Sequence, residues 1–305
     1  MLDWRIAPRL RTIGRLDVRR RQLIRFAVGA GGWAFGVLVA YWGFTLGFMR
    51  LGGGDDVMYA AVGRAFWTGA DVYSLGVSSQ PFLYSPPWAA VFGLFPSAVA
   101  VYLAILAANL VALRYLAGSW LAVGYLAWFP IVPWELAWGN INIMMAAAIV
   151  AGVRGSGALP MAFGLAKWSP LLSLSPKAWR GAAAVLGLAL VITLPRLDTW
   201  PAWMARLLWM NDHPLGPLVP VPLAIRVAIA LGLLALRRPW SRALAAVVAT
   251  PAFYVASFVL LIAPICVWLR RWDQPSQLSV PAERANNDGY PPIAGAPAES
   301  EYRAC

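Results

Sequence analysis

The stretch that decides the fold is "LIRFAVGAGGWAFGVLVAYWGFTLGF", residues 23–48. It is longer than the roughly 20 apolar residues that a helix needs to cross a bilayer. Eight arginines stand between Arg5 and Arg25, and no small-residue cleavage site ends the run. We therefore predict a first membrane helix rather than a removable signal peptide. The same arginines predict that the basic segment 1–22 is cytoplasmic.

The composition extends this prediction to the rest of the chain. Of its 305 residues, 60% are hydrophobic and 12% are charged, and the mean hydropathy is +0.64. So little polar surface predicts an all-α, polytopic protein of the cytoplasmic membrane, with the membrane domain at 23–270. The net charge of +12 could suggest nucleic acid. The arginine cluster directly precedes a membrane helix and lacks interleaved aromatics, so we expect membrane lipids and no nucleic acid as partners.

The later hydrophobic runs are short and interrupted by proline, which predicts broken helices and a cavity among them. We expect about eight to ten membrane helices in all. One break is expected near Lys167 and Pro170, and another within "ATPAFY", residues 249–254. The runs lie at 97–116, 119–134, 141–153, 158–175, 181–194, 221–236 and 243–269.

The distribution of charge predicts which segments face outward. With the amino terminus inside, the basic residues between the runs can all be cytoplasmic, and the acidic residues before the tail all lie outside. The two long connections, 50–96 and 195–220, are then outer loops rich in tryptophan and tyrosine. The tail, 271–305, is expected to be disordered and cytoplasmic. Cys266 and Cys305 do not suggest a disulfide, and "GAGGW" at 29–33 favours close helix packing over dinucleotide binding.

Asp55 and Asp56 are the candidate catalytic residues. They begin "DDVMYAAVGRAFWTG", residues 55–69, which we expect to be an interfacial helix because acidic residues favour a helix start and Gly69 favours its end. The two aspartates could serve only as helix caps. A carboxylate against the bilayer would instead have a raised pKa and could deprotonate a hydroxyl.

Lys167, in "GLAKWSP", is the leading candidate for binding an anion. A lysine near the bilayer centre costs roughly 2.5 to 3.5 kcal/mol, so such residues are usually paired or line a polar site. Asn140 and Asn142, in "WGNINIMM", are expected at the outer mouth of a helix, where helix capping would explain one of them.

The remaining candidate binding residues are three arginines and the histidine. Arg64, Arg206 and Arg226 either contact substrate or anchor helices at the membrane interface. His213, the only histidine, lies beside Asn211 and Asp212 in the second outer loop and is either an ordinary surface residue or a catalytic or phosphate-contacting one. The sequence has no GxxxxGK[ST], HExxH, CxxC or GxSxG motif. We expect no cofactor; a divalent ion at the two aspartates stays open.

An ordered series of motifs resembles the GT-C superfamily of membrane glycosyltransferases, and within it the glycosyltransferase 87 family. The resemblance covers about residues 30–265. It is carried by Asp55 four residues before Tyr59, "TGADVYS", "FLYSPPWAAVF" with Tyr84, "WGNINIMM", "AFGLAKWSPLL" with Lys167, and "MNDHPLG" ahead of Arg226.

The resemblance implies a GT-C-like helical bundle that transfers a hexose, such as mannose, from a polyprenyl-phosphate donor to a lipid or glycan acceptor with inversion. It implies that Asp55 is the base and that Lys167, Asn140 and Asn142 contact donor phosphate and sugar. Tyr59 and Tyr84 belong to the same substrate-binding set, and Asn211 and His213 would face donor or acceptor. An outer active site has no nucleotide sugars, which independently favours a lipid-linked donor.

Two alternatives remain. Broken helices and a buried lysine also suit a lipid or solute transporter, although no convincing inverted repeat is present. The second alternative is a non-catalytic subunit of an envelope-glycan assembly system, which would bind lipid-linked sugar without turnover.

Overall fold

The computed structural model describes residues 6–51, 55–74, 82–212, 221–251 and 255–269. These residues form helices and connecting turns, with no strand among them, which confirms the predicted all-α class. The chain divides into two units, Met1–Trp268 and Leu269–Cys305. All the helices discussed below lie in the first unit apart from the last residue of α13, and the predicted disordered tail lies outside the described residues.

Three helical stretches are long and apolar enough to cross a membrane, and they make this a helical membrane protein. They are Val18–Thr45 in α1 (Ile6–Leu51), α4 (Ala98–Ala117), and Pro176–Arg196 around α9 (Trp179–Thr193). Local sequence sets the ends of α4. The Ser97 side chain accepts a hydrogen bond from Ala100 N, and Gly118 ends the helix in the left-handed conformation, with φ of 81°.

A fourth span is made if two shorter helices are counted together. Helices α6 (Ile131–Ala137) and α7 (Asn142–Val153) pass the same test as a pair but are bent by 115° at the break between them. Gly139 lies in this break with φ of 64°, a conformation that favours glycine. The expected eight to ten membrane helices are therefore not confirmed: the described residues hold three, or up to four with the bent pair.

The count is lower because the other apolar runs fold into short helices. Both breaks predicted from the sequence are present: α8 ends at Gly164, ahead of Lys167, and α12 ends at Val248, ahead of Pro251. Proline next to the ends of these runs limits helix length because it lacks a backbone donor. The short helices are α5 (Trp120–Ala127), α8 (Ala158–Gly164), α11 (Leu223–Ala235), α12 (Pro239–Val248) and α13 (Ile262–Leu269), with the 3₁₀ segments η1 (Ser169–Ser173), η2 (Pro176–Ala178), η3 (Leu194–Arg196) and η4 (Val255–Leu261).

The glycine-rich patch of α1 packs against α5, as predicted. A Cβ atom on Gly32 would lie 1.8 Å from the carbonyl oxygen of Gly124, and one on Gly124 would lie 2.1 Å from that of Gly29. The two backbones can approach this closely only because all three residues lack a side chain. Helix α1 itself is longer than the predicted span, because it continues back through the arginine-rich segment to Ile6.

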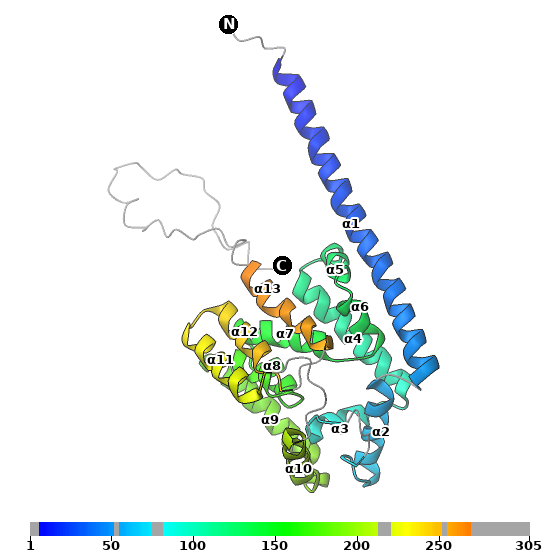
Figure 1. The fold of residues 1–305 in the computed structure, drawn as a ribbon, viewed down its shortest axis with the longest axis vertical. Helices are drawn as coiled ribbons and strands as arrows, with labels where there is room; N and C mark the ends of the chain where they lie inside the picture. The colour runs from blue at the N-terminus through cyan, green and yellow to red at the C-terminus, as the bar shows by residue number, and fades with distance from the viewer. Residues whose placement is uncertain (1–5, 52–54, 75–81, 213–220, 252–254, 270–305) are drawn as a thin grey trace, which may run out of the picture. The chain divides into compact units, whose positions relative to one another are not determined.

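Three helices gather at one end of the first unit (Figure 1): α2 (Asp55–Thr68), α3 (Pro86–Phe92) and α10 (Thr199–Asp212). The predicted helix 55–69 is confirmed as α2, which ends ahead of Gly69 with φ of 81°. Arg196 holds the end of α2, because its guanidinium donates to Phe66 O at 2.8 Å and to Ala70 O at 3.1 Å. Asp198 pairs with the same guanidinium at 3.1 Å.

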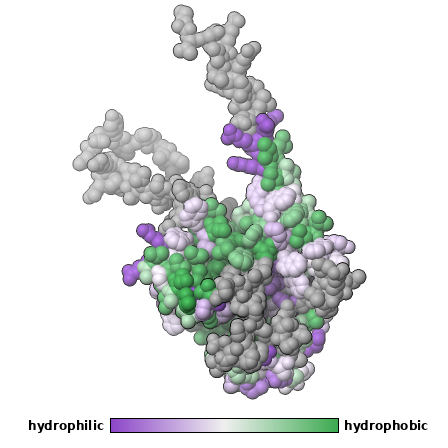
Figure 2. Space-filling model, in the orientation of Figure 1, coloured by the Kyte–Doolittle hydropathy of each residue, from purple (hydrophilic) through white to green (hydrophobic). Residues whose placement is uncertain are grey.

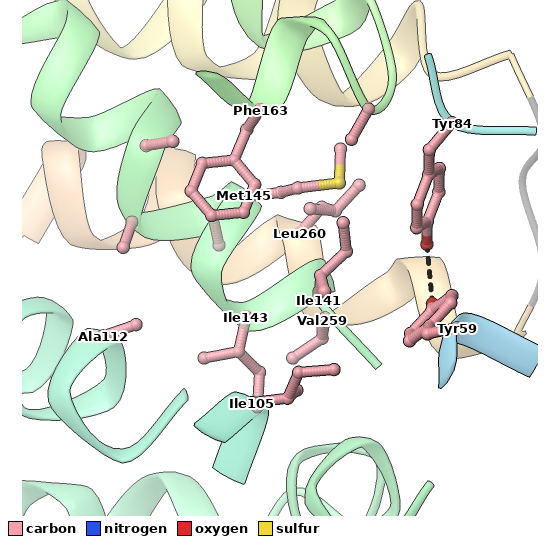
Figure 3. Close-up of a cluster of buried hydrophobic side chains, with 14 of the residues drawn as sticks. Tyr59, Tyr84, Ile105, Ala112, Ile141, Ile143, Met145, Phe163, Val259 and Leu260 are labelled. Atoms are coloured by element: carbon pink, nitrogen blue, oxygen red, sulfur yellow. Dashed lines mark hydrogen bonds between the residues drawn. The ribbon is translucent and has the colours of Figure 1, made fainter. Parts of the chain in front are cut away.

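Helix α7 lies at the centre of the core (Figure 3), where Ile143 and Met145 are fully buried against residues of α4, α8 and η4. The outside of the first unit is apolar in many places. Figure 2 shows hydrophobic surface over much of the face in view, with hydrophilic residues on the described beginning of α1 and at the opposite end. Leu23, Val37 and Leu38 of α1 are more than half exposed, as expected for side chains that face lipid.

Candidate functional site

The bend between α6 and α7 joins three segments that the sequence analysis selected separately. The backbone N–H of Asp55, the first residue of α2, donates to Trp138 O at 3.3 Å, which ties α2 to the end of α6. Ser85 N donates to Leu165 O at 3.1 Å, which ties the chain ahead of α3 to the turn that carries Lys167. Asp55, Asn142 and Lys167, far apart in sequence, therefore meet in one site.

Lys167 is held by the amide of Asn142. Its ammonium donates a hydrogen bond to Asn142 Oδ1 at 3.1 Å. Asn142 is buried at the first position of α7, and Lys167 is half-buried. Among the described residues Lys167 has no ion-pair partner within 4.0 Å, although it interacts electrostatically with Asp55 and Glu135. An ammonium has three N–H donors, so two remain for a ligand.

Asp55 has the electrostatic surroundings of a base. Burial raises the pKa of its carboxyl from 3.8 to about 6, which Lys167 opposes and the neighbouring Asp56 reinforces. The hydroxyl of Tyr59, one helical turn further on, also stabilises the ionised form. A carboxyl with this pKa is ionised at neutral pH and still accepts a proton readily.

Asp56 occupies a different environment from Asp55. It is 1% exposed, whereas Asp55 is half-buried, and its Cβ lies 3.6 Å from the position of a Cβ added to Gly139. The positive charge of Lys167 lowers the pKa of the Asp55 carboxyl, and the negative charge of Asp56 raises it. Of the two aspartates, the half-buried Asp55 is the one that a ligand can reach.

Glu135 is the member of the site that the sequence analysis did not select. It lies in α6, is 1% exposed, and interacts electrostatically with Lys167, Asp55 and Asn142. Neither of its carboxylate oxygens has a hydrogen-bond partner of normal geometry among the described residues. A carboxylate inside an apolar run is costly and usually functional, so its place in "PWELAW" was the signal that could have identified it.

Two tyrosines form one wall of the site. The hydroxyls of Tyr59 and Tyr84 are 2.9 Å apart, and both side chains are buried at the edge of the apolar cluster (Figure 3). The Tyr59 ring stacks on Phe92 with ring centroids 4.4 Å apart. Tyr73 donates a hydrogen bond to Tyr84 O at 3.0 Å. These contacts fix the two hydroxyls near Asp55.

Other candidates have structural contacts instead. The side-chain oxygen of Asn140 accepts from Ile141 N at 2.7 Å, and Asn109 donates to Asn140 O at 2.7 Å, so Asn140 stabilises the bend. The guanidinium of Arg226 donates to the carbonyls of Val221, Val248, Thr250 and Pro251, which holds the end of α12. Arg64 is exposed on α2. The structure does not bring these three side chains into the charged cluster.

The candidates in the predicted second outer loop cannot be placed in the site. His213 lies outside the described residues, and so does the side chain of Asn211, whose backbone belongs to the last turn of α10. Arg206 lies on α10 and is half-buried. Within the described ranges no group of three or more His, Cys, Asp and Glu residues could hold a metal ion.

No protein-family model matches the sequence, and neither a curated protein nor a solved structure matches it significantly.

Proposed function

We propose that this protein is a membrane glycosyltransferase that moves a hexose, such as mannose, from a polyprenyl-phosphate donor to a lipid or glycan hydroxyl. The observation that supports this most is the position of Asp55, a carboxyl of raised pKa, in one cluster with Lys167 and Asn142. A base and an anion-binding cation in one half-buried site meet the two needs of this reaction.

Asp55 would act as the general base. Its carboxylate accepts the proton of the acceptor hydroxyl, while the hydroxyl oxygen attacks the anomeric carbon of the hexose. The bond between that carbon and the phosphate oxygen breaks, and the phosphate leaves with the electron pair. A single displacement of this kind inverts the anomeric carbon and needs no oxidant or reductant.

Lys167 would hold the leaving phosphate. Two of its three N–H donors are free of partners among the described residues, and its charge offsets the negative charge that grows on the phosphate as the bond breaks. Asn142 holds the ammonium in place through its side-chain oxygen.

The compartment of the site is part of the proposal. The positive-inside pattern of the sequence favours an extracytoplasmic α2, and nucleotide sugars are absent there. A sugar bound to a lipid phosphate is then the donor class that can reach Asp55.

The test uses the full chain reconstituted in proteoliposomes with mannose labelled on polyprenyl phosphate and a mixture of lipid acceptors. The wild type is expected to form a lipid-linked product one hexose larger, and Asp55→Asn to form none. Asp71→Asn is the matched control, because Asp71 Oδ1 accepts from Tyr73 N at 2.9 Å and from Ser74 N at 3.3 Å in a turn, which an asparagine oxygen can also do. No product from the wild type, or equal product from Asp55→Asn, would refute the proposal.

A transporter is the second candidate, and one observation favours it. The 115° bend between α6 and α7 beside the half-buried Lys167 resembles the broken helices that bind substrates in transporters. The same proteoliposomes separate the two functions, because a transporter moves labelled lipid between leaflets and leaves its hexose attached.

A further inference from the structure

The structure points to a role for Glu135 that the proposed chemistry does not use. Its buried carboxylate interacts electrostatically with Asn142, the first residue of α7, although neither of its oxygens makes a hydrogen bond of normal geometry there. Asn142 in turn accepts the hydrogen bond from Lys167 through its side-chain oxygen. Glu135, Asn142 and Lys167 therefore form a chain of three polar groups from the buried interior to the half-buried end of the site.

The burial of Glu135 excludes direct contact with a ligand in this conformation. The residue is 1% exposed and both of its oxygens are covered. An isolated buried carboxylate costs several kcal/mol unless a positive charge or hydrogen bonds compensate it. Lys167 is the cation that interacts with it most strongly. The buried carboxylate of Glu135 is therefore expected to act through Lys167 and Asn142, and not by binding a ligand itself.

The charged groups around Glu135 determine how its carboxylate affects the protonation of Lys167. Its titratable neighbours are Lys167, Asp55 and Tyr59. The described side chains of α1, α5, α7 and η4, which pack against α6, place no further ionised group beside it. Asp55 must give up its negative charge each time it accepts a proton. Glu135 takes no part in that proton transfer, and its carboxylate favours the protonated form of Lys167.

We propose that Glu135 is a positioning residue that keeps Lys167 protonated and orients the Asn142 amide, so that the Lys167 ammonium presents its free donors to a phosphate monoester or diester. The proposal rests on the proposed function for the identity of the phosphate, and extends it to the residue that maintains the anion-binding half of the site. Removing the negative charge would let Lys167 lose its proton at lower pH and would free the Asn142 amide to rotate.

The experiment measures binding of polyprenyl phosphate without sugar to the full chain in nanodiscs between pH 6 and 10. Glu135→Gln is expected to weaken binding by roughly 10- to 100-fold at neutral pH, because Lys167 loses a negative charge that favours its ammonium form. The pH at which binding is lost on the alkaline side is expected to move down. Glu135→Asp keeps the charge and should leave that pH near its wild-type value. Asp198→Asn removes a carboxylate that pairs with Arg196 and should behave as wild type.

A structural role alone would weaken binding equally at every pH, and this result, or unchanged binding in Glu135→Gln, would overturn the proposal. If Glu135→Gln does not fold, Glu135→Asp decides: an alkaline midpoint at the wild-type pH supports the proposal, and a midpoint that moves down although the charge is kept overturns it. Kinetics provide a second check: a raised KM for donor and a lowered kcat are expected, because Lys167 contacts the phosphate both in the bound donor and as it leaves. A wild type that binds polyprenyl phosphate in this way but transfers no sugar would refute the glycosyltransferase function and leave the role of Glu135 standing.

Discussion

The Lys167 ammonium donates a hydrogen bond of 3.1 Å to Asn142 Oδ1, which joins the turn after α8 to the first residue of α7. This contact depends on the 115° bend between α6 and α7, because the bend turns the start of α7 into the interior. The site is therefore a product of tertiary packing around a broken helix, and its stability and its chemistry should respond to the same side chains.

Lys167→Met should destabilise the protein by about 3 kcal/mol, because it leaves the buried Glu135 without its main compensating charge. The double variant Lys167→Met/Glu135→Gln should recover part of this loss. Denaturation in detergent measures both effects. Lys177→Met is the control, because Lys177 is exposed and its loss should change stability little. A double variant less stable than Lys167→Met would contradict the pairing.

Asp55→Asn should stabilise the protein above pH 6. In the folded protein the pKa of Asp55 is raised from 3.8 to about 6, so the protonated carboxyl contributes stability that is fully present below pH 3.8. That contribution is lost as the pH rises through about 6. The neutral amide avoids the loss and should gain about 1 to 3 kcal/mol at pH 8. Thermal unfolding at pH 4 and pH 8 tests this, and a gain that is the same at both values would argue against it.

The hydrogen bond between Tyr59 and Tyr84 should contribute about 1 kcal/mol. Tyr59→Phe removes the hydroxyl and keeps the ring that stacks on Phe92. The double-mutant cycle with Tyr84→Phe isolates the contribution of the pair, measured by denaturation. Additive losses in the two single variants would mean that the hydroxyls do not stabilise one another.

Gly32→Ala should destabilise the packing of α1 on α5 by about 1 to 3 kcal/mol, because the new Cβ meets the backbone of Gly124. Gly187→Ala is the matched control in α9, since a Cβ there meets nothing within 4 Å. Alanine in a helix interior is favoured over glycine, so the control should be neutral or slightly stabilising. Thermal stability in one detergent compares the two, and equal effects would contradict the close packing.

The ends of several helices were predicted from the sequence more accurately than the number of membrane-spanning helices. The acidic start and the glycine end of α2 are local signals, and the breaks beside Lys167 and Pro251 follow from proline, so all of these were predicted. The number of spans is not confirmed, because the runs expected to be broken are short helices in the described residues, and three stretches, or up to four with the bent pair, are long enough to cross a membrane. The 115° bend of α6 and α7 depends on packing around Gly139.

Part of the candidate site was also predicted from the sequence, and part of it was not. Asp55, Asn142 and Lys167 were selected because each is a polar residue in an unusual place along the chain. Glu135 stands in an equally unusual place, inside the apolar run "PWELAW", but its connection to the site depends on neighbours in other segments. Asn140 and Arg226 were selected on similar grounds, yet the Asn140 side-chain oxygen and the Arg226 guanidinium bind backbone groups, which sequence spacing does not reveal.

The most direct measurement for the central claim compares donor binding with turnover in Asp55→Asn. Polyprenyl-phosphate mannose should bind this variant with nearly wild-type affinity, because Lys167 and Asn142 are unchanged. Single-turnover transfer of the bound mannose should fall by about 100- to 10,000-fold, the loss typical of a missing general base. Bound donor that is transferred at the wild-type rate would contradict the account.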